Sequence, residues 1–502
     1  MSMERRIVKT ACGAVAGTTE HGVSVFKGIP YAKPPVGRLR WAPPQECDPW
    51  DGVRECNRFG HAATQAKSPL VNTQPDEDCL FLNVWTPEHS QGRKLPVYFW
   101  IHGGGYFNGC GTMEYYDGSS FARKDVIVVT INYRLGALGF LALETLMEQY
   151  GTTGNWGTLD QLAALKWVQK NIAAFGGDPA RVTLAGESAG AFSVSSLIMS
   201  PLAKGLFSRA VMESGNLLSN RVAVPHTGAT LEGSIANSRN FAAIFGADDS
   251  PEGLEKLRGV DAMKLWETGF FSSDASLESP MAFWSTQDGV VIPRDPLKAL
   301  RAGDYNHGQF LMGYNLGEGA VFIGQNSSQE GARRYPALIF GDKAPLIEAY
   351  YQGKNLAPLP KLVDIVTYAY FKAGMTEFAG ELSRQGQDVY VYQYDFTPDG
   401  NYPMKELGPH HTVELLYTFA SIPMTGLTEG PGDKVVEAQM NTLWSNFITN
   451  GDPNAGRPLA DGTVWEKYDP AAPRIYHINE TCSFRPTWDQ ETIELFSLAL
   501  EY

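Results

Sequence analysis

Residues 186–190 read Gly-Glu-Ser-Ala-Gly, with Ser188 at the centre and a glycine two residues away on each side. The pentad follows the apolar run 182–185, which is typical of a buried strand, and precedes the helix-compatible run 191–199. Glycines in a tight strand-to-helix turn let a serine oxygen stand clear of a sheet and act as a nucleophile. Roughly 0.3 such pentads are expected by chance in a chain of this length and glycine content. The pentad alone therefore does not establish a catalytic site, and the other residues that such a site needs must also be present in the sequence.

A second glycine-rich segment, 102–106 (His-Gly-Gly-Gly-Tyr), follows the apolar run 97–101. Successive glycines allow the backbone to approach a ligand closely and to direct several N–H groups at one point. Acyl transfer by a serine needs such donors for the negatively charged oxygen that forms during the reaction. This segment therefore predicts an oxyanion-binding loop, with a plain glycine turn as the alternative interpretation.

The elements around these segments alternate short apolar runs with helical patterns. The predicted strands are 97–101, 126–131, 182–185, 210–213, 310–313 and 389–394. The clearest helix is 158–175, which has an apolar period near 3.6 residues and stops at two glycines. This alternation predicts a mostly parallel sheet with helices on both faces, in which functional loops gather at the carboxyl ends of the strands.

Two helix-rich segments, 222–283 and 321–375, lie between predicted core strands. We interpret them as insertions that cover the sheet and form the walls of a pocket. Separate domains are not expected, because the candidate reactive residues are spread from position 102 to position 411. Residues 1–502 are therefore predicted to form one domain.

The composition excludes several classes of function. The formal net charge is −14 and no block of lysine or arginine is present, which disfavours nucleic acid as a partner. No apolar stretch has the length of a membrane span or the pattern of a signal peptide. The cysteines lack metal-binding spacing and are expected to be free thiols in the cytoplasm. They are Cys12, Cys47, Cys56, Cys79, Cys110 and Cys482. No metal-ligand cluster or phosphate-binding loop is present, so no cofactor is predicted.

Further motifs stand in the order seen in one enzyme family. They are 26–32 (Phe-Lys-Gly-Ile-Pro-Tyr-Ala), 77–84 (Glu-Asp-Cys-Leu-Phe-Leu-Asn-Val), 132–134 (Asn-Tyr-Arg) and 175–179 (Phe-Gly-Gly-Asp-Pro). Together with the two glycine-rich segments, they make the chain resemble the type-B carboxylesterase/lipase family, which includes p-nitrobenzyl esterases and cholinesterases. The resemblance implies an α/β-hydrolase fold, with a mostly parallel central sheet flanked by helices and helical insertions over the active site.

The same resemblance implies the partners of Ser188. Glu318 follows a predicted strand and corresponds to the family's acidic residue. Two adjacent histidines follow the last predicted strand, and the family's catalytic histidine has a glutamate three residues further on. Glu414 therefore selects His411, with His410 as the alternative. The order of nucleophile, acid and base along the chain is that of the α/β-hydrolase fold.

These residues predict a serine carboxylesterase that hydrolyses small to medium esters through an acyl-enzyme on Ser188. The expected oxyanion donors are the N–H groups of Gly104, Gly105 and Ala189. The alternatives are a lipase for longer acyl chains and a non-catalytic adhesion or binding member of the same fold. The expected partner is a small-molecule ester, and the sequence does not predict an oligomeric state.

The resemblance also implies two supporting ion pairs and the absence of one disulfide. The pairs are Arg40 with Glu77 and Arg134 with Asp160. Secreted members join the cysteine that corresponds to Cys79 to a cysteine upstream, but Ala63 stands at that upstream position. Free thiols are therefore expected, and a bond between Cys56 and Cys79 is the alternative.

Overall fold

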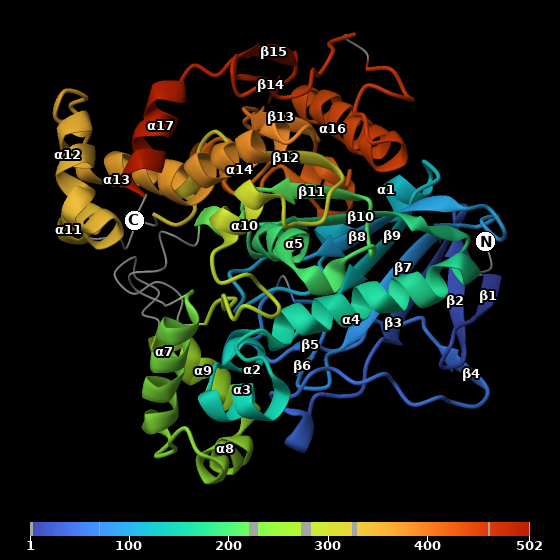
Figure 1. The fold of residues 1–502 in the computed structure, drawn as a ribbon. Helices are drawn as coiled ribbons and strands as arrows, with labels where there is room; N and C mark the ends of the chain where they lie inside the picture. The colour runs from blue at the N-terminus through green and yellow to red at the C-terminus, as the bar shows by residue number, and fades with distance from the viewer. Residues whose placement is uncertain are drawn as a thin grey trace.

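One mixed β-sheet runs through the computed structural model, which describes residues 4–69, 71–219, 229–272, 283–323, 329–459 and 462–500 (Figure 1). The strand order is β1-β2-β3-β7-β9-β8-β10-β11-β12-β13-β14-β15, and β4 pairs with β2. The strands are β1 (Glu4–Lys9), β2 (Ala14–Glu20), β3 (Val23–Pro30), β4 (Val53–Glu55), β7 (Phe81–Pro87), β8 (Leu95–Ile101), β9 (Ile127–Ile131), β10 (Gly177–Glu187), β11 (Arg209–Glu213), β12 (Gln309–Asn315), β13 (Asp388–Tyr394), β14 (Arg474–Ile478) and β15 (Ser483–Pro486). Two short strands, β5 (Ala62–Ala63) and β6 (Pro75–Asp76), form a separate pair.

The centre of this sheet is parallel, and both of its edges are antiparallel. Strands β9, β8, β10, β11, β12, β13 and β14 pair in parallel in that order. Antiparallel pairs continue the sheet from β9 through β7, β3 and β2 to β1, and from β14 to β15. All of the strands predicted from the sequence lie in the parallel centre, so the expected sheet is confirmed.

Strand β8 explains why the predicted strands are continuously apolar. Its alternate side chains lie in two separate cores, with Val97, Phe99 and Ile101 in one and Tyr98 and Trp100 in the other. The first core includes apolar side chains of α4 (Trp156–Asn171) and α5 (Ala189–Met199), and the second includes those of α16 (Pro431–Asn450). Because successive side chains of a strand point to opposite faces, helices on both faces require apolar residues at every position.

The remaining helices lie around the sheet, some against it and some further away (Figure 1). They are α1 (Ser119–Ala122), α2 (Gly136–Phe140), α3 (Glu144–Tyr150), α7 (Leu231–Ile244), α8 (Pro251–Arg258), α9 (Ala262–Ser272), α10 (Pro296–Ala302), α11 (Gln329–Phe340), α12 (Ala344–Gln352), α13 (Pro358–Val366), α14 (Ala373–Arg384), α15 (Leu415–Thr418) and α17 (Gln490–Ala499). The predicted helix 158–175 is present as α4, which begins two residues earlier, followed by a 3-10 turn that stops at Gly176. None of the helices in the described ranges combines the length and apolar character needed to cross a membrane.

Both predicted insertions are helical where the structure describes them. The first contains α7, α8 and α9, and the second contains α11, α12, α13 and the π-helical turn η8 (Thr367–Lys372). Residues 222–228, 273–282 and 324–328 of these insertions lie outside the described residues.

The two ion pairs implied by the family resemblance are present in the structure. The guanidinium group of Arg40 forms a bidentate pair with Glu77, at 2.7 and 2.5 Å, and donates to the carbonyl oxygen of Val260 at 2.6 Å. This contact fixes the first insertion between α8 and α9. Arg134 pairs with Asp160 of α4 in the same bidentate way, at 2.8 and 2.7 Å, and both side chains are buried.

Candidate active site

The sequence-predicted site residues follow the carboxyl ends of strands in the parallel centre. Gly104 and Gly105 follow β8, Ser188 follows β10, Glu318 follows β12, and His411 follows β13. In the sheet these four strands lie in the order β8, β10, β12 and β13, with β11 between β10 and β12. Parallel strands end at a common edge, so this edge collects residues that are far apart in the sequence.

Ser188 forms the turn between β10 and α5 in a backbone conformation that is rare for L-residues, with φ of 54° and ψ of −126°. Its N–H donates to the carbonyl oxygen of Glu213 at 2.9 Å, and its carbonyl oxygen accepts from the N–H of Phe192 at 3.0 Å. Such strain persists only where the surrounding structure enforces it, and it is concentrated at functional sites. The half-buried side chain of Ser188 is more accessible than its buried neighbours Glu187 and Ala189.

Close backbone packing requires both glycines of the pentad. A Cβ atom at Gly186 would lie 2.6 Å from the carbonyl oxygen of Gly190 and 2.7 Å from that of Ile101, and one at Gly190 would lie only 2.1 Å from the carbonyl oxygen of Ile101. Since Ile101 ends β8, this close approach brings the loop 102–106 against the turn. A Cβ atom at Gly103 would lie 3.0 Å from Cβ of Ser188. A larger residue at either pentad glycine would therefore separate Ser188 from the glycine loop.

The glycine loop is held in place by its first residue, His102. Nδ1 of His102 donates to the carbonyl oxygen of Gly103 at 2.8 Å, and the ring stacks on Tyr133 with centroids 4.5 Å apart. Burial lowers the pKa of His102 to about 4, so the ring is neutral at neutral pH and fills a structural role. Gly104 and Gly105 have φ of 102° and 62°, a region that favours glycine.

His411 and Glu318 are in direct contact, although 93 positions separate them in the sequence. Nδ1 of His411 lies 2.6 Å from Oε2 of Glu318, and both side chains are buried. Oε1 of Glu318 accepts the N–H of Asn315 at 2.7 Å. A carboxylate that accepts Nδ1–H leaves Nε2 as the basic nitrogen of a neutral imidazole. Nε2 of His411 is buried and has no hydrogen-bond partner among the described residues.

His410 has a different environment from its neighbour. Its Nδ1 donates to the carbonyl oxygen of His411 at 2.7 Å, and its ring stacks on Tyr402 with centroids 5.6 Å apart. Burial lowers the pKa of His410, which favours its neutral form. The side chain of His410 thus stabilises the loop, whereas the side chain of His411 faces Glu318.

Comparisons with known proteins place the whole chain in a family. The sequence profile of the carboxylesterase family matches residues 4–495. The chain is 34% identical to the para-nitrobenzyl esterase of Bacillus subtilis (strain 168) over 484 residues, which cover 93% of each chain. It is 35% identical to the fumonisin B1 esterase of Sphingopyxis macrogoltabida over 89% of this chain and 82% of that one. The chain belongs to the carboxylesterase family.

A solved structure shares the fold of this carboxylesterase family member. The crystal structure of a carboxylesterase from Geobacillus stearothermophilus matches with a TM-score of 0.85 and 33% sequence identity, over 98% of this chain and 99% of that one. The α/β-hydrolase fold implied by the sequence motifs is therefore confirmed. The protein is a carboxylic ester hydrolase of this fold.

Two buried glutamates lie close to the candidate site, and sequence reasoning gave neither of them a role there. Oε1 of Glu187 lies 3.1 Å from Nε2 of His411, and Oε2 of Glu414 accepts a hydrogen bond from Asn315. Burial and the repulsion of neighbouring carboxyl groups raise the pKa of both glutamates well above the usual range. These shifts favour the neutral form of both carboxyl groups. Only their positions in the sequence could have pointed to them, because Glu187 directly precedes Ser188 and Glu414 stands three residues after His411.

Glu213 lies at the end of β11, and its titration should make the stability of the fold depend on pH. Its buried carboxylate accepts from Nε1 of Trp444 at 3.0 Å and from the hydroxyl of Thr418 at 3.2 Å. Burial nevertheless raises the pKa of Glu213 from 4.5 to about 7. The folded protein thus binds this proton more tightly than the unfolded chain does. The contribution of Glu213 to stability is therefore greatest at low pH and is lost as the pH rises from about 4.5 to about 7.

We expect the variant Glu213→Gln to melt at a higher temperature than the wild type above pH 7, because glutamine keeps the shape but carries no charge. The difference in Tm should shrink as the pH falls towards 5, where the wild-type carboxyl is protonated in the folded state. Differential scanning fluorimetry of both proteins across this pH range measures the effect. A difference in Tm that does not change with pH would contradict the role of burial at Glu213.

Two aromatic rings of the second insertion pack against His411. The ring of Phe322 lies 5.0 Å from the imidazole, and the ring of Phe371 lies 4.8 Å from it. Phe371 belongs to η8, and π-helical turns within helices are frequent at functional sites. From the same turn, the hydroxyl of Thr367 accepts the N–H of Gly319 at 2.9 Å, next to the candidate acidic residue. One turn of helix therefore contacts both the imidazole and the loop of its carboxylate partner.

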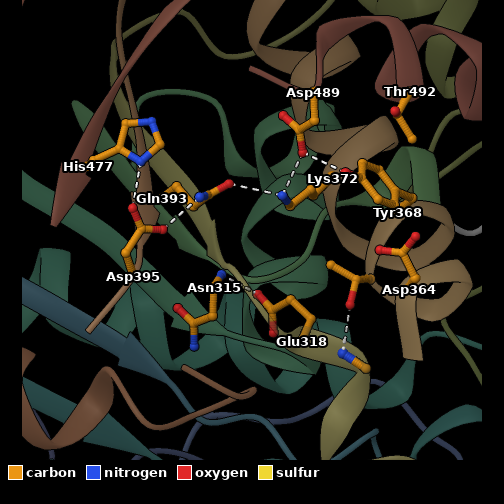
Figure 2. Close-up of polar contacts among 12 residues, drawn as sticks. Asn315, Glu318, Asp364, Tyr368, Lys372, Gln393, Asp395, His477, Asp489 and Thr492 are labelled. Atoms are coloured by element: carbon orange, nitrogen blue, oxygen red, sulfur yellow. Dashed lines mark hydrogen bonds and ion pairs between the residues drawn. The ribbon is translucent and has the colours of Figure 1, made fainter. Parts of the chain in front are cut away.

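A buried ion pair anchors η8 to the C-terminal part of the chain (Figure 2). Nζ of Lys372 lies 2.8 Å from Oδ2 of Asp489, just before α17, and 2.9 Å from Oε1 of Gln393 in β13. The hydroxyl of Tyr368 donates to the same Asp489 oxygen at 2.7 Å. Removing one partner of a buried pair leaves an uncompensated charge, so this network holds η8 in place beside Glu318, which Figure 2 also shows.

Proposed function

We propose that the protein hydrolyses carboxylic esters through an acyl-enzyme on Ser188, with His411 as the base and Glu318 as the carboxylate that orients it. Nε2 of His411 accepts the proton of Ser188 as Oγ attacks the ester carbonyl. The tetrahedral intermediate then expels the alcohol, which takes the proton from His411. Water repeats the same sequence on the acyl-enzyme, releasing the acid and restoring Ser188.

The observation that carries this proposal is the environment of the His411 ring. Glu318 accepts from one ring nitrogen at 2.6 Å. The other nitrogen is buried without a hydrogen-bond partner among the described residues, beside Glu187, which precedes Ser188. A general base needs one nitrogen oriented by a third group and the other nitrogen left for the nucleophile's proton. His410 instead directs Nδ1 at a backbone carbonyl.

We infer that the oxyanion is bound by the N–H groups of Gly104, Gly105 and Ala189. Ala189 is the first residue of α5, where N–H groups lack partners within the helix and the helix dipole favours negative charge. The close packing of Gly103 on Ser188 brings the glycine loop to the same turn. Donors from two elements then surround the position beside the serine oxygen.

We expect Gly104→Ala to lower kcat by about 10²–10³, the usual effect of losing one oxyanion donor, with a much smaller change in KM. The backbone of Gly104 has φ of 102°, and the added Cβ would lie 2.2 Å from the carbonyl oxygen of Asn108, so the loop must shift. Initial rates with p-nitrophenyl butyrate measure kcat and KM. The matched control is Gly22→Ala, because Gly22 has φ of 78° but open space around it. Equal kcat for Gly104→Ala and the wild type would contradict the assignment.

We propose that the preferred substrates are small to medium esters with an apolar or aromatic group. The rings of Phe322 and Phe371 beside His411 provide apolar surface for such a group. The similar protein of Bacillus subtilis is named para-nitrobenzyl esterase, and a nitrobenzyl ester carries an aromatic alcohol. Hydrolysis of p-nitrophenyl acetate, butyrate and palmitate tests the proposal. We expect kcat/KM to be highest for the short esters, whereas activity that rises with chain length and on emulsified substrate would favour a lipase.

We also propose that residues 1–502 form one domain, and that the protein acts in the cytoplasm. In support of one domain, a single sheet takes in strands from Glu4 to Pro486, with the two main cores on its opposite faces. In support of a reducing compartment, none of the six cysteines, all of which lie in the described ranges, is joined in a disulfide. Cys56 and Cys79 are thus not bonded to each other.

A further inference from the structure

Two cysteines that are remote in the sequence lie together at one edge of the fold. Cys12 is in the turn between β1 and β2, and Cys47 is in the loop before β4. Their Sγ atoms are 2.6 Å apart, and Sγ of Cys12 also lies 3.5 Å from the carbonyl oxygen of Cys47. The other cysteines are buried, whereas these two are half-buried. The pair therefore combines proximity with access to solvent.

The backbone on both sides of this thiol pair is fixed by hydrogen bonds. The N–H of Trp50 donates to the carbonyl oxygen of Cys12 at 2.8 Å, and Nε1 of Trp50 donates to Ala14 at 3.0 Å. The N–H of Ala11 donates to the side chain of Asn171 at the end of α4, at 2.7 Å. The turn and the loop are thus held against each other by contacts that do not involve sulfur, so bonding of the two sulfur atoms requires little movement of the backbone.

An open cavity beside the pair gives a small reagent access to the sulfur atoms. Its volume is about 340 Å³, and its lining includes Cys12, Cys47, Lys166 and Lys170. This volume lies in the range of small-molecule sites. The ammonium group of Lys166 suits a carboxylate of glutathione, whereas that of Lys170 lies 3.2 Å from the carboxylate of Glu46, which also lines the cavity. A low-molecular-weight peptide disulfide is therefore a chemically suitable oxidant.

We propose that Cys12 and Cys47 form a redox-active dithiol that closes to a disulfide in the presence of a low-molecular-weight disulfide such as oxidised glutathione. The thiolate of Cys12 attacks one sulfur of oxidised glutathione, and one glutathione thiolate leaves. The thiolate of Cys47 then attacks Sγ of Cys12 in this mixed disulfide and displaces the second glutathione thiolate. Two electrons pass from the protein to the oxidant, which yields two molecules of reduced glutathione, and the two protein protons pass to the released thiolates or to solvent.

The order of these steps follows from the environment of Cys47. Burial and the hydrogen bond to Cys12 raise the pKa of Cys47 to about 12. A thiol with such a pKa has little thiolate at neutral pH and is a poor first nucleophile. Once Cys12 carries glutathione, Cys47 lies next to the electrophilic sulfur, and proximity favours closure of the ring.

The disulfide should stabilise the fold and leave the proposed active site unchanged. It closes a loop between residues 35 positions apart, which restricts the unfolded chain and raises Tm by an amount on the order of 3–5 °C in a protein of this size. Strands β3, β7, β9 and β8 separate β2 from β10 in the sheet, which places the pair roughly 20–25 Å from the serine turn. The dithiol is therefore separate from the proposed active site.

The test compares the full-length protein after incubation with oxidised glutathione and after incubation with dithiothreitol. Thiol titration of the denatured protein should find two fewer thiols in the oxidised sample than the six of the reduced chain. Peptide mapping under non-reducing conditions should find one cross-link, between the peptides that contain Cys12 and Cys47. Thermal unfolding should give the higher Tm for the oxidised protein, while the hydrolysis of p-nitrophenyl acetate stays the same in both samples.

Two variants make the assignment specific. Cys12→Ser should abolish both the cross-link and the gain in Tm. Cys482→Ser removes a buried cysteine elsewhere, whose Sγ contacts Gln439, and it should retain both effects. The proposal would be overturned by a glutathione adduct on Cys12 that never resolves, by a cross-link between other cysteines, or by an equal gain in Tm in the Cys12→Ser variant.

Discussion

Replacing Ser188 with alanine is expected to lower kcat for p-nitrophenyl acetate by on the order of 10⁶, the usual cost of losing a serine nucleophile. The residual rate would come from substrate binding and the oxyanion donors. KM should change much less than kcat, because the hydroxyl acts in the bond-forming step and contributes little to binding the ester. Steady-state rates at high enzyme concentration measure the loss.

The same replacement should leave the fold intact. The strained backbone at Ser188, with φ of 54°, is enforced by its neighbours and not by the hydroxyl group. Alanine keeps the Cβ atom and the two backbone hydrogen bonds of the turn, to Glu213 and from Phe192. Far-UV circular dichroism and Tm should therefore match those of the wild type. A Ser188→Ala variant that keeps more than a tenth of the wild-type kcat would contradict the proposed nucleophile.

Replacing His411 with alanine is expected to lower kcat about as much as the loss of Ser188, because the two residues act as a unit. The double variant Ser188→Ala with His411→Ala should then be no slower than either single variant. This non-additive result distinguishes a shared chemical step from two independent losses of stability. His411→Gln provides a second test, since glutamine fills the buried site beside Glu318 but cannot act as a base.

The matched control for His411 is its neighbour in the sequence. His410→Ala removes one hydrogen bond to a backbone carbonyl and the stacking on Tyr402, so it should lower Tm slightly and spare most of the activity. The opposite pattern, in which His410→Ala inactivates the enzyme and His411→Ala does not, would show that the wrong histidine was assigned. Kinetics of both variants with one ester, together with thermal unfolding, decide between them.

The parts of the fold that the sequence predicted are those governed by local rules. Strands such as β8 were predictable because both of their faces are buried and every residue is therefore apolar. The serine turn was predictable because Gly186 and Gly190 both face the carbonyl oxygen of Ile101, which leaves no room for a side chain. The ion pair of Arg134 with Asp160 followed from the family resemblance and is present in the structure.

Other features depend on contacts between distant segments and carry no local signal. Phe371 reaches His411 only because η8 is tied to the start of α17 through Lys372 and Asp489. The proximity of Glu187 to Nε2 of His411 depends on how the loop after β13 returns to β10. Residue types and spacing could not reveal either contact. The same holds for the half-buried pair of Cys12 and Cys47.

The central claim is that the oxygen of Ser188 becomes covalently bonded during turnover. The most direct measurement is reaction of the full-length protein with diethyl p-nitrophenyl phosphate, followed by peptide mapping by mass spectrometry. We expect one equivalent of p-nitrophenolate per active site, complete loss of esterase activity, and a single diethylphosphoryl group on the peptide that contains Ser188. A protein that is inactivated with the group on another residue, or that stays fully active without any adduct, would contradict the account.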